Sequence, residues 1–196
     1  MQLRFADPLT DAEAIAAIYA PHVAAGYASF EATPPSALEM GQRIAATLQQ
    51  TPWLVAHVAS EVIGYAYAAP HRARAGYRWS LDVSTYVADR WHRHGVATAL
   101  YRALFSILGA QGFVNVYAGI ALPNEGSLRL HRSMGMVEVG TYHGVGFKDG
   151  VWRDVTWLEL ALRDRPPSPA DPIALPELLA TDAGRAAIEA ALRQMT

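Results

Sequence analysis

The sequence predicts one mixed α/β domain followed by a C-terminal extension, and three observations lead to this prediction. The chain has 196 residues, of which 52% are apolar, enough for a single sizeable hydrophobic core. Runs with the periodicity of helices and of strands follow one another as far as residue 162. Beyond that point the chain turns proline-rich. We therefore place the domain in residues 1–162, and a proline-rich linker with a short C-terminal helix (expected over 181–195) in residues 163–196.

The first expected elements are a short strand and an amphipathic helix. Residues 3–6 alternate between apolar and other residue types, which is typical of a strand. Thr10 and Glu13 have the spacing of a capping box, in which a hydroxyl and a carboxylate three residues apart stabilise a helix start. Apolar residues at helical spacing follow, so we expect a helix over residues 11–24.

A second helix and a hairpin come next. Ser36 and Glu39 repeat the capping-box spacing, and the helix that they predict runs to about residue 50. Residues 53–58 and 62–68 are β-rich runs separated by three residues, a pattern that indicates a β-hairpin.

The centre of the chain predicts a polar loop, a strand and a long helix. Arginines occupy the loop over residues 70–78, and the strand over 79–87 has an irregular pattern near Asp82. The helix over residues 95–111 carries one continuous apolar face. It ends at Gly112, where a glycine supplies the left-handed conformation of a helix C-cap.

The last third of the domain predicts a buried strand, a short helix and a second hairpin. Residues 113–121 are mostly apolar, which indicates a strand buried on both faces. A short helix then ends at Gly135. Strands over 137–147 and 151–162 follow, and the Asp149-Gly150 pair between them is a strong signal for a tight hairpin turn.

The composition excludes several kinds of function. The formal net charge of −2, without a basic cluster, gives no sign of a nucleic-acid partner. The chain has no cysteine, which excludes disulfides, zinc–thiolate sites and a thiol nucleophile. The N-terminus lacks a signal-peptide pattern, and no apolar run approaches the ~18 residues of a membrane span. We therefore expect a cytoplasmic protein that binds neither membranes nor nucleic acid.

The junction between the central strand and the long helix is a candidate anion site. Gly95 and Ala97 leave the backbone open to a phosphate, and the free N–H groups at the start of the helix point toward an anion there. Arg90 and Arg93 add positive charge. The loop matches neither a Gly-rich P-loop nor a dinucleotide fingerprint. Alone, a Gly-x-Ala pattern at a helix start is more often plain structure than a binding site.

An ordered series of motifs narrows this interpretation. From residue 4 to about residue 162 the chain resembles the GNAT N-acetyltransferase superfamily, and within it the phosphinothricin and methionine sulfoximine acetyltransferases. The matching residues are Ser29-Phe30-Glu31, Pro52-Trp-Leu-Val-Ala56, Pro70-x-Arg72-x-Arg74-x-x-Tyr77-x-Trp79, Tyr86-Val87, His92-Arg-x-Gly-x-Ala97, Leu122-Pro-Asn124-x-x-Ser127, His131-x-x-x-Gly135 and Gly146-Phe-Lys-Asp-Gly-x-Trp152-x-Asp154.

The resemblance implies a fold and a co-substrate. The implied fold is a central twisted sheet of about seven strands, mixed but mainly antiparallel, flanked by about four helices. The sheet splays in the middle, between the strands at 79–87 and 113–121, where a bulge would free backbone groups from the ladder. The co-substrate is acetyl-CoA, and no metal is expected. The implied acetyl-CoA contacts are Thr85, Tyr86, Val87, Arg93, His94, Gly95, Val96, Ala97, Thr98, Asn124, Ser127 and Ser133.

The implied chemistry is attack of an amine on the thioester. The Val87 N–H is the implied donor to the oxyanion that develops. A carboxylate must accept the ammonium proton, and Asp82 stands where the family pattern has Glu, three residues after a Trp. Asp82 either serves as this base, through a water because it is one methylene shorter, or simply caps a bulge or pairs with Arg78. Glu31 and His131 are the reserve candidates for the base.

Substrate recognition is expected on the polar loop. Arg72 and Arg74 can both bind a carboxylate or phosphinate, which suits an amino-acid-like substrate, although alone they would be an ordinary solvated loop. The resemblance also assigns Phe30, Glu31 and Tyr77 to the substrate site, and it implies a homodimer. Outside the resemblance, the aromatic residues would count as core.

Some residues depart from the family or admit another interpretation. His92 replaces the usual Gln or Arg of the anion loop, which weakens the anion contact or makes it pH-dependent. His92 and His94 provide two metal ligands at most, so we expect no metal site. Trp152 and Trp157 on the last strand belong either to the core or to a dimer interface.

Three hypotheses about function follow. The first is an acetyltransferase for the α-amine of a small amino-acid analogue such as phosphinothricin, methionine sulfoximine or methionine sulfone. The second keeps the family but changes the acceptor to a polyamine, an antibiotic amine or a protein N-terminus; Arg72 and Arg74 argue against cationic acceptors. The third is an acyl-CoA-binding module without catalytic activity.

Overall fold

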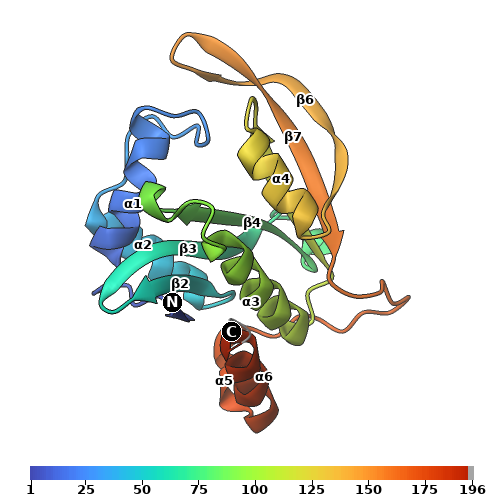
Figure 1. Cartoon of the computed structure of the whole chain (residues 1–196). Coiled ribbons are helices and arrows are strands. Elements are labelled where there is room, and N and C mark those ends of the chain that lie inside the picture. The colour runs from blue at the N-terminus through green and yellow to red at the C-terminus, as the bar shows by residue number, and fades with distance from the viewer. Residues whose placement is uncertain (194–196) are drawn as a thin grey trace.

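The computed structural model describes residues 1–193, and its centre is a seven-stranded sheet with the strand order β1-β2-β3-β4-β5-β7-β6 (Figure 1). Only the β4–β5 pair is parallel. The strands are β1 Gln2–Phe5, β2 Trp53–Val58, β3 Glu61–Pro70, β4 Ser80–Val87, β5 Asn115–Ala121, β6 Val137–Lys148 and β7 Val151–Ala161. The helices are α1 Ala12–Ala24, α2 Ala37–Leu48, α3 Val96–Gln111, α4 Glu125–Ser133, α5 Leu175–Ala180 and α6 Asp182–Arg193, with 3-10 turns η1 Ala75–Tyr77 and η2 Asp89–Trp91.

The sheet splays apart between β4 and β5. These two strands pair only from Ser80 opposite Asn115 to Asp82 opposite Tyr117, and they diverge beyond that point. The splay predicted between these strands is therefore confirmed. The bulge expected near Asp82 is wrong, because the ladder between β3 and β4 runs without a register shift. The free backbone groups of β4 arise from the divergence itself.

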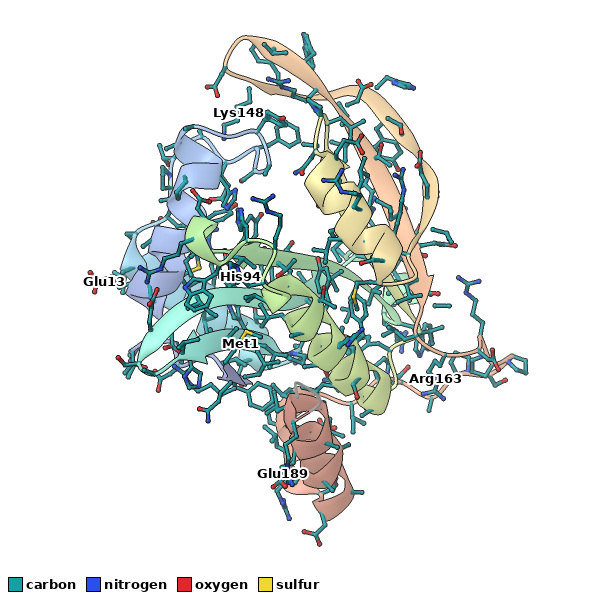
Figure 2. All side chains as sticks on the ribbon, in the orientation of Figure 1. Met1, Glu13, His94, Lys148, Arg163 and Glu189 are labelled. Carbon is teal, nitrogen blue, oxygen red and sulfur yellow. The ribbon has the colours of Figure 1, made fainter. Side chains whose placement is uncertain are left out.

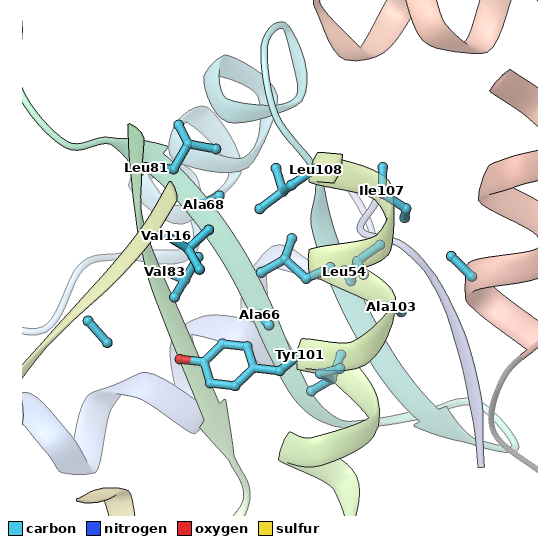
Figure 3. Close-up of a cluster of buried hydrophobic side chains, with 14 of the residues drawn as sticks. Leu54, Ala66, Ala68, Leu81, Val83, Tyr101, Ala103, Ile107, Leu108 and Val116 are labelled. Carbon is cyan, nitrogen blue, oxygen red and sulfur yellow. The ribbon is translucent and has the colours of Figure 1, made fainter. Parts of the chain in front are cut away.

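Apolar side chains form two core layers, one on each face of the sheet. On one face, α1 and α2 cover β2 and β3. On the other face, α3 packs against β2 to β5, as Figure 3 shows for residues such as Leu54, Val83 and Leu108. The amphipathic pattern predicted for residues 95–111 therefore places α3 correctly.

The local signals for helix and hairpin ends were mostly right. Ser36 and Glu39 form the predicted capping box, with the Glu39 N–H donating to Ser36 Oγ at 3.2 Å and the Ser36 N–H donating to Glu39 Oε2 at 2.7 Å. Gly112 adopts the left-handed conformation (φ 96°) that ends α3. Asp149 and Gly150 both have positive φ, 51° and 77°, as a two-residue hairpin turn between β6 and β7 requires.

The capping box predicted at the start of α1 is wrong. The N-cap residue is Asp11, and no side chain caps the helix. The Asp7 carboxylate accepts the N–H groups of Leu9 and Thr10, while both oxygens of Asp11 accept from Arg4, at 2.5 and 2.7 Å. The ion pair of Asp11 with Arg4 on β1 thus stands in place of the capping box predicted from Thr10 and Glu13.

Strand β5 is less buried than its apolar sequence predicted. Its side chains alternate, with Val116, Ala118 and Ile120 buried and Tyr117 and Gly119 partly or fully open. Val116, Ala118 and Ile120 belong to the core layer that contains α3, whereas the opposite layer of α1 and α2 contains no residue of β5. The prediction of burial on both faces is therefore wrong, because the helices that cover β2 and β3 do not extend past the split onto β5.

The C-terminal extension packs onto the core. Residues 163–174 form no helix or strand, and α5 and α6 follow. Helix α6 begins at Asp182 and confirms the predicted helix as far as residue 193; residues 194–195 of that prediction lie outside the described part. The apolar side chains Leu175, Leu178, Ile188 and Ala191 join the core layer that contains α3. In Figure 1, α5 and α6 lie below α3, far from the β6–β7 hairpin.

The buried side chain of Gln111 links the extension to the sheet. Its Nε2 donates to the carbonyls of Gln50 and Ile173, at 2.7 and 2.9 Å. Backbone bonds from Ile173 to Gln111 and from Leu175 to Gln50 lie beside it. Among residues 1–193, no helix has the length and apolar character that a membrane span requires.

Burial of α6 gives a test of how much the extension stabilises the domain. Ile188 is 4% exposed, so Ile188→Ala removes buried methyl groups and should lower the free energy of unfolding by about 2–4 kcal/mol in a denaturant titration. Leu179→Ala is the matched control, because Leu179 is 36% exposed and should cost far less. Equal effects of the two substitutions would contradict a stabilising role for α6.

Candidate active site

The gap between β4 and β5 opens into a cavity of about 870 Å³. Consecutive residues line it on both strands, 83–87 on β4 and 118–121 on β5, and the first turn of α3 and one side of α4 complete it. Because successive strand residues point to opposite faces, a lining of consecutive residues means that the cavity passes through the sheet. One opening therefore faces α3 and α4, and the other faces α1.

Two backbone amides of β4 point into this gap. The Ala88 N–H donates to the Ile63 carbonyl, and the register pairs Val87 with Gly64 and Tyr86 with Tyr65. Antiparallel ladders alternate, so the N–H groups of Thr85 and Val87 point away from β3, toward the missing partner strand. The Tyr86 N–H belongs to the β3 ladder instead. Of the three expected free amides, the structure therefore frees two.

The start of α3 faces the same cavity. Gly95 is the N-cap in the left-handed conformation (φ 78°), and the preceding Arg93 also has positive φ, 64°. The first backbone bond of the helix is from the Ala99 N–H to the Gly95 carbonyl, so the N–H groups of residues 96–98 remain available. These amides, at the positive end of the helix dipole and lining the cavity, form an anion site.

The two histidines of this loop take different positions. His92 lines the cavity, and its Nε2 donates to the Val87 carbonyl at 2.8 Å, which ties the loop to the end of β4. His94 packs edge-on against Trp91 and donates from Nδ1 to the His92 carbonyl (Figure 2). Of the loop residues expected to contact acetyl-CoA, His94 alone does not line the cavity.

Helix α4 supplies the opposite wall. Asn124 caps the helix by accepting the Ser127 N–H at 3.1 Å, and Ser133 Oγ donates to the Leu130 carbonyl at 2.7 Å. Asn124, Ser127 and Ser133 all line the cavity. The structure thus brings the three residues together at one cavity, and two of the side chains also form hydrogen bonds within the helix.

His131 on α4 is buried and has both ring nitrogens engaged. Its Nδ1 donates to the Ser127 carbonyl at 2.8 Å, so its Nε2 accepts the hydroxyl of Tyr101 at 2.9 Å. Burial lowers the pKa of His131, which favours this neutral form. Since the lone pair already receives the Tyr101 proton, His131 is poorly placed to accept another. Figure 3 shows the Tyr101 hydroxyl directed away from α3.

Asp82 lies at the point where β4 and β5 part, and its partner is a residue that sequence analysis did not assign. Asp82 Oδ1 accepts a hydrogen bond from His71 Nδ1 at 2.6 Å. Burial raises the pKa of Asp82, and the His71 hydrogen bond opposes that shift. Asp82 therefore neither caps a bulge nor pairs with Arg78, the two alternatives to a role as the base. The β3–β4 ladder has no bulge, and Arg78 binds Asp171 at 2.9 Å.

The expected substrate residues fall into two groups. Arg72, Arg74 and Tyr77 are exposed on the loop between β3 and β4. The guanidinium of Arg72 lies 5.8 Å from the centre of the Trp157 ring and donates to the His71 carbonyl. This loop therefore presents positive charge directly beside Asp82.

Phe30 and Glu31 come from the loop between α1 and α2. The Phe30 ring fills the space over Gly146 on β6, where a Cβ would lie 2.2 Å from it. Glu31 binds Arg43 through both oxygens and accepts the Tyr19 hydroxyl, and the Arg43 contact lowers the pKa of its carboxyl. A reserve base whose oxygens are all engaged is poorly suited to accept a proton.

Lys148 fastens the same loop to the β6–β7 hairpin. Its Nζ donates to the carbonyls of Val23 and Ser29, at 2.6 and 2.8 Å, and Figure 2 shows it between the hairpin tip and the loop.

Within residues 1–193, no three His, Cys, Asp or Glu side chains are placed together to hold a metal ion.

Comparisons with known proteins agree with this geometry. Residues 6–157 match the model of the acetyltransferase (GNAT) domain. The phosphinothricin N-acetyltransferase of Streptomyces viridochromogenes is 42% identical over 123 residues, 62% of this chain and 67% of that protein. The L-methionine sulfoximine/L-methionine sulfone acetyltransferase of Pseudomonas paraeruginosa is 37% identical over 115 residues, 58% of this chain and 67% of that protein.

A crystal structure gives the same result in three dimensions. The GNAT superfamily phosphinothricin acetyltransferase of Sinorhizobium meliloti, determined in complex with acetyl-CoA, superposes with a TM-score of 0.80. It is 33% identical to this chain, and the alignment covers 86% of this chain and 92% of that one.

The Tyr101–His131 pair gives a test of the cavity floor. Tyr101→Phe leaves the buried His131 Nε2 without its donor, so it should lower the free energy of unfolding by about 1–2 kcal/mol in a denaturant titration. Tyr77→Phe, the matched control, removes the hydroxyl of an exposed tyrosine and should change stability by less than about 0.5 kcal/mol. A neutral Tyr101→Phe would show that the hydrogen bond contributes no net stability.

Proposed function

The chain belongs to the GNAT acetyltransferase family and is an acetyl-CoA-dependent N-acetyltransferase, and on that premise we propose that its acceptor is the α-amine of a small amino-acid-like molecule. Phosphinothricin, methionine sulfoximine and methionine sulfone are the acceptor types that the names of its relatives suggest. The observation that carries the proposal is the cavity at the split between β4 and β5, whose lining includes the free amides at the start of α3. Arg72 lies over Trp157, whose side chain packs against Gly119 of the cavity lining, and Arg74 is exposed on the same loop.

The proposed roles at the co-substrate opening follow from the free backbone groups. The amides of residues 96–98, with Arg93, bind the pyrophosphate of acetyl-CoA. The Thr85 amide holds the pantetheine arm. The Val87 N–H donates to the thioester carbonyl oxygen and stabilises the negative charge that develops there as the amine attacks. Both strand amides are suited to this because no strand partner competes for them.

The proposed roles at the acceptor opening belong to the loop between β3 and β4. Arg72 and Arg74 bind the carboxylate or phosphinate of the acceptor through forked hydrogen bonds. Asp82 belongs to the site that accepts the ammonium proton. Phe30 and Tyr77 contact the apolar part of the acceptor. The same two arginines would repel a polyamine or an aminoglycoside, which makes cationic acceptors the less favoured alternative.

A panel of amines tests the proposed function. Release of free CoA from acetyl-CoA should be fastest with phosphinothricin, methionine sulfoximine or methionine sulfone, and slow with polyamines and aminoglycosides. Arg74→Ala should raise KM for the anionic acceptors about tenfold or more, because one forked contact is lost, with little change in KM for acetyl-CoA. Arg102→Ala, on the exposed side of α3, is the matched control.

Two outcomes would contradict this function. Binding of acetyl-CoA without turnover on any amine would indicate an acyl-CoA-binding module. Turnover that prefers cationic amines and is unchanged by Arg74→Ala would assign the enzyme to a different acceptor class.

We also propose that the protein is a homodimer that pairs through the β6–β7 hairpin. Trp152 of this hairpin is exposed to 66%. The other exposed large apolar side chains of the hairpin are Val137, Val139, Tyr142, Val145, Phe147 and Val151. Such a concentration of exposed apolar side chains on one hairpin is typical of an interface.

A charge on the hairpin tests the dimer. Trp152→Glu should convert the protein to a monomer at micromolar concentration in analytical ultracentrifugation, because a carboxylate is costly to bury in an apolar interface. Leu179→Glu, a charge at a partly exposed position of α5, should leave the dimer intact. A wild-type monomer at that concentration, or a Trp152→Glu dimer, would contradict the proposed interface.

A further inference from the structure

His71 and Asp82 form a hydrogen-bonded pair at the base of the split between β4 and β5. The two residues are diagonal neighbours across the β3–β4 ladder, because the His71 N–H donates to the Ser80 carbonyl and Ala69 stands opposite Asp82. The small side chain of Ala69 leaves room for the short carboxylate to reach the ring. The two side chains lie on the sheet face that α1 covers. Tyr86, four residues after Asp82 on β4, lies on the same face and contacts Tyr19 of α1.

The His71 ring is held in place as well as bonded. It stacks on Tyr117 of β5 with ring centres 4.4 Å apart, and it meets Trp157 edge-on with ring centres 5.9 Å apart. The His71 side chain is 14% exposed. Since the carboxylate accepts a proton only from the ring, Nδ1 carries the hydrogen and Nε2 keeps a free lone pair. A fixed tautomer with one free nitrogen is the arrangement of a general base.

The pair lies next to the reaction cavity. Ser84 and Gly119 line the cavity, and each is two residues along its strand from Asp82 and Tyr117 respectively. Two residues of a strand span about 7 Å, so Asp82 and Tyr117 each lie about that far along their strands from a residue that lines the cavity. His131 and Glu31, the other candidate bases, have their acceptor atoms occupied.

We propose that His71 is the proton acceptor of the acetyl transfer and that Asp82 is the positioning residue that fixes its tautomer. This inference rests on the proposed function and names the group that performs one of its steps. The ammonium N–H bond breaks and its proton moves to His71 Nε2, directly or through one water. The freed lone pair forms the new C–N bond, and the C–S bond breaks.

The proton balance is complete without another reactant. The second proton leaves the nitrogen when the tetrahedral intermediate collapses, and it ends on the sulfur of CoA. The first proton passes from His71 to solvent, so each turnover yields the amide, CoA and one proton. Asp82 stays ionised throughout and stabilises the imidazolium that forms beside it.

The proposal also accounts for the aspartate at this position. The family pattern has a glutamate here, which is one methylene longer. In this chain the imidazole of His71 adds to the shorter carboxylate of Asp82, and together they extend further than a glutamate side chain would. The proton-accepting nitrogen is therefore one imidazole ring beyond the carboxylate.

The experiment compares four variants in the acetyl transfer assay over a range of pH. His71→Asn keeps a side-chain N–H for Asp82 but lacks the Nε2 lone pair, His71→Ala removes the ring, and Asp82→Asn removes the carboxylate. His57→Asn is the control, because His57 lies on β2 and donates only to the Ala59 carbonyl. Acetyl-CoA binding by calorimetry and thermal unfolding verify that each variant is folded. The groups that face the pair, and that are kept unchanged, are Arg72, Tyr77, Tyr117, Trp157, Glu159 and Arg165.

We expect His71→Asn to lower kcat/KM for the acceptor about 100-fold or more, with acetyl-CoA binding unchanged. His71→Asn changes the pH profile of kcat/KM for the acceptor, whereas His57→Asn leaves that profile as in the wild type. Added imidazole restores part of the activity of His71→Ala, which a purely structural role would not produce. Asp82→Asn loses less than His71→Asn, because the ring remains. His57→Asn behaves as wild type.

Two kinetic results would overturn the proposal. If His71→Asn stays within about threefold of wild type while Asp82→Asn is inactive, the carboxylate alone accepts the proton. If both variants stay within threefold, the proton is accepted elsewhere.

A measurement without turnover separates this inference from the proposed function. Long-range ¹H–¹⁵N spectra report which ring nitrogen of His71 carries the hydrogen. The Nδ1–H tautomer in the wild type, lost in Asp82→Asn, is expected; an Nε2–H tautomer overturns the proposal because the lone pair would face Asp82. A wild type with the Nδ1–H tautomer but no activity on any amine would instead contradict the proposed function.

Discussion

The divergence of β4 from β5 is the constraint on which the rest of the structure depends. Each of the two strands is fully paired on its outer side, β4 with β3 and β5 with β7, and they pair with each other over only three positions. Below the split, Leu81, Val83 and Val116 pack in one core layer with α3. The two halves of the sheet are thus joined at one end and held apart at the other, and the backbone groups between them have no partner.

These unpartnered groups explain why the chemistry gathers at one place. A buried amide without an acceptor is costly, so a splayed sheet is stable only if a ligand or water takes the exposed hydrogen-bonding positions. Thr85 and Val87 have N–H groups outside the β3–β4 ladder, and the start of α3 has three more free N–H groups. In the proposed function, acetyl-CoA accepts from these groups in the gap between β4 and β5. The proposed acceptor then enters beside the loop that carries Arg72 and Arg74.

Much of this could be predicted from the sequence where the signal is local. Ser36 and Glu39 form their box, and Asp149-Gly150 turns the last hairpin, because each device needs only a few consecutive residues. Signals failed where a distant partner decided the outcome. Arg4 on β1 takes the carboxylate of Asp11, and the capping box next to it does not form. The apolar run of β5 indicated full burial, since a sequence pattern cannot show that the helices covering β2 and β3 do not reach it.

The same limit applies to the candidate site. The ordered motifs identified the family, and all the residues expected to contact acetyl-CoA except His94 line the cavity. They did not identify His71, because its partner Asp82 is joined to it only by the register of the β3–β4 ladder. The exceptions to local reasoning are therefore concentrated at the split, where the geometry of two strands rather than the order of residues determines which groups meet.

The C-terminal extension also helps to position the loop between β3 and β4, although no family motif covers it. Arg78 binds Asp171 and the Trp79 indole donates to the Ala170 carbonyl at 2.8 Å, so the extension holds the loop between β3 and β4 from outside. His71 and Asp82 hold the same loop from inside. Since Gln111 and the apolar side chains of α5 and α6 anchor the extension to the core, the loop that presents the two arginines is fixed at both of its ends. In the proposed function, this fixed loop lowers the entropy lost when an acceptor carboxylate binds to the two arginines.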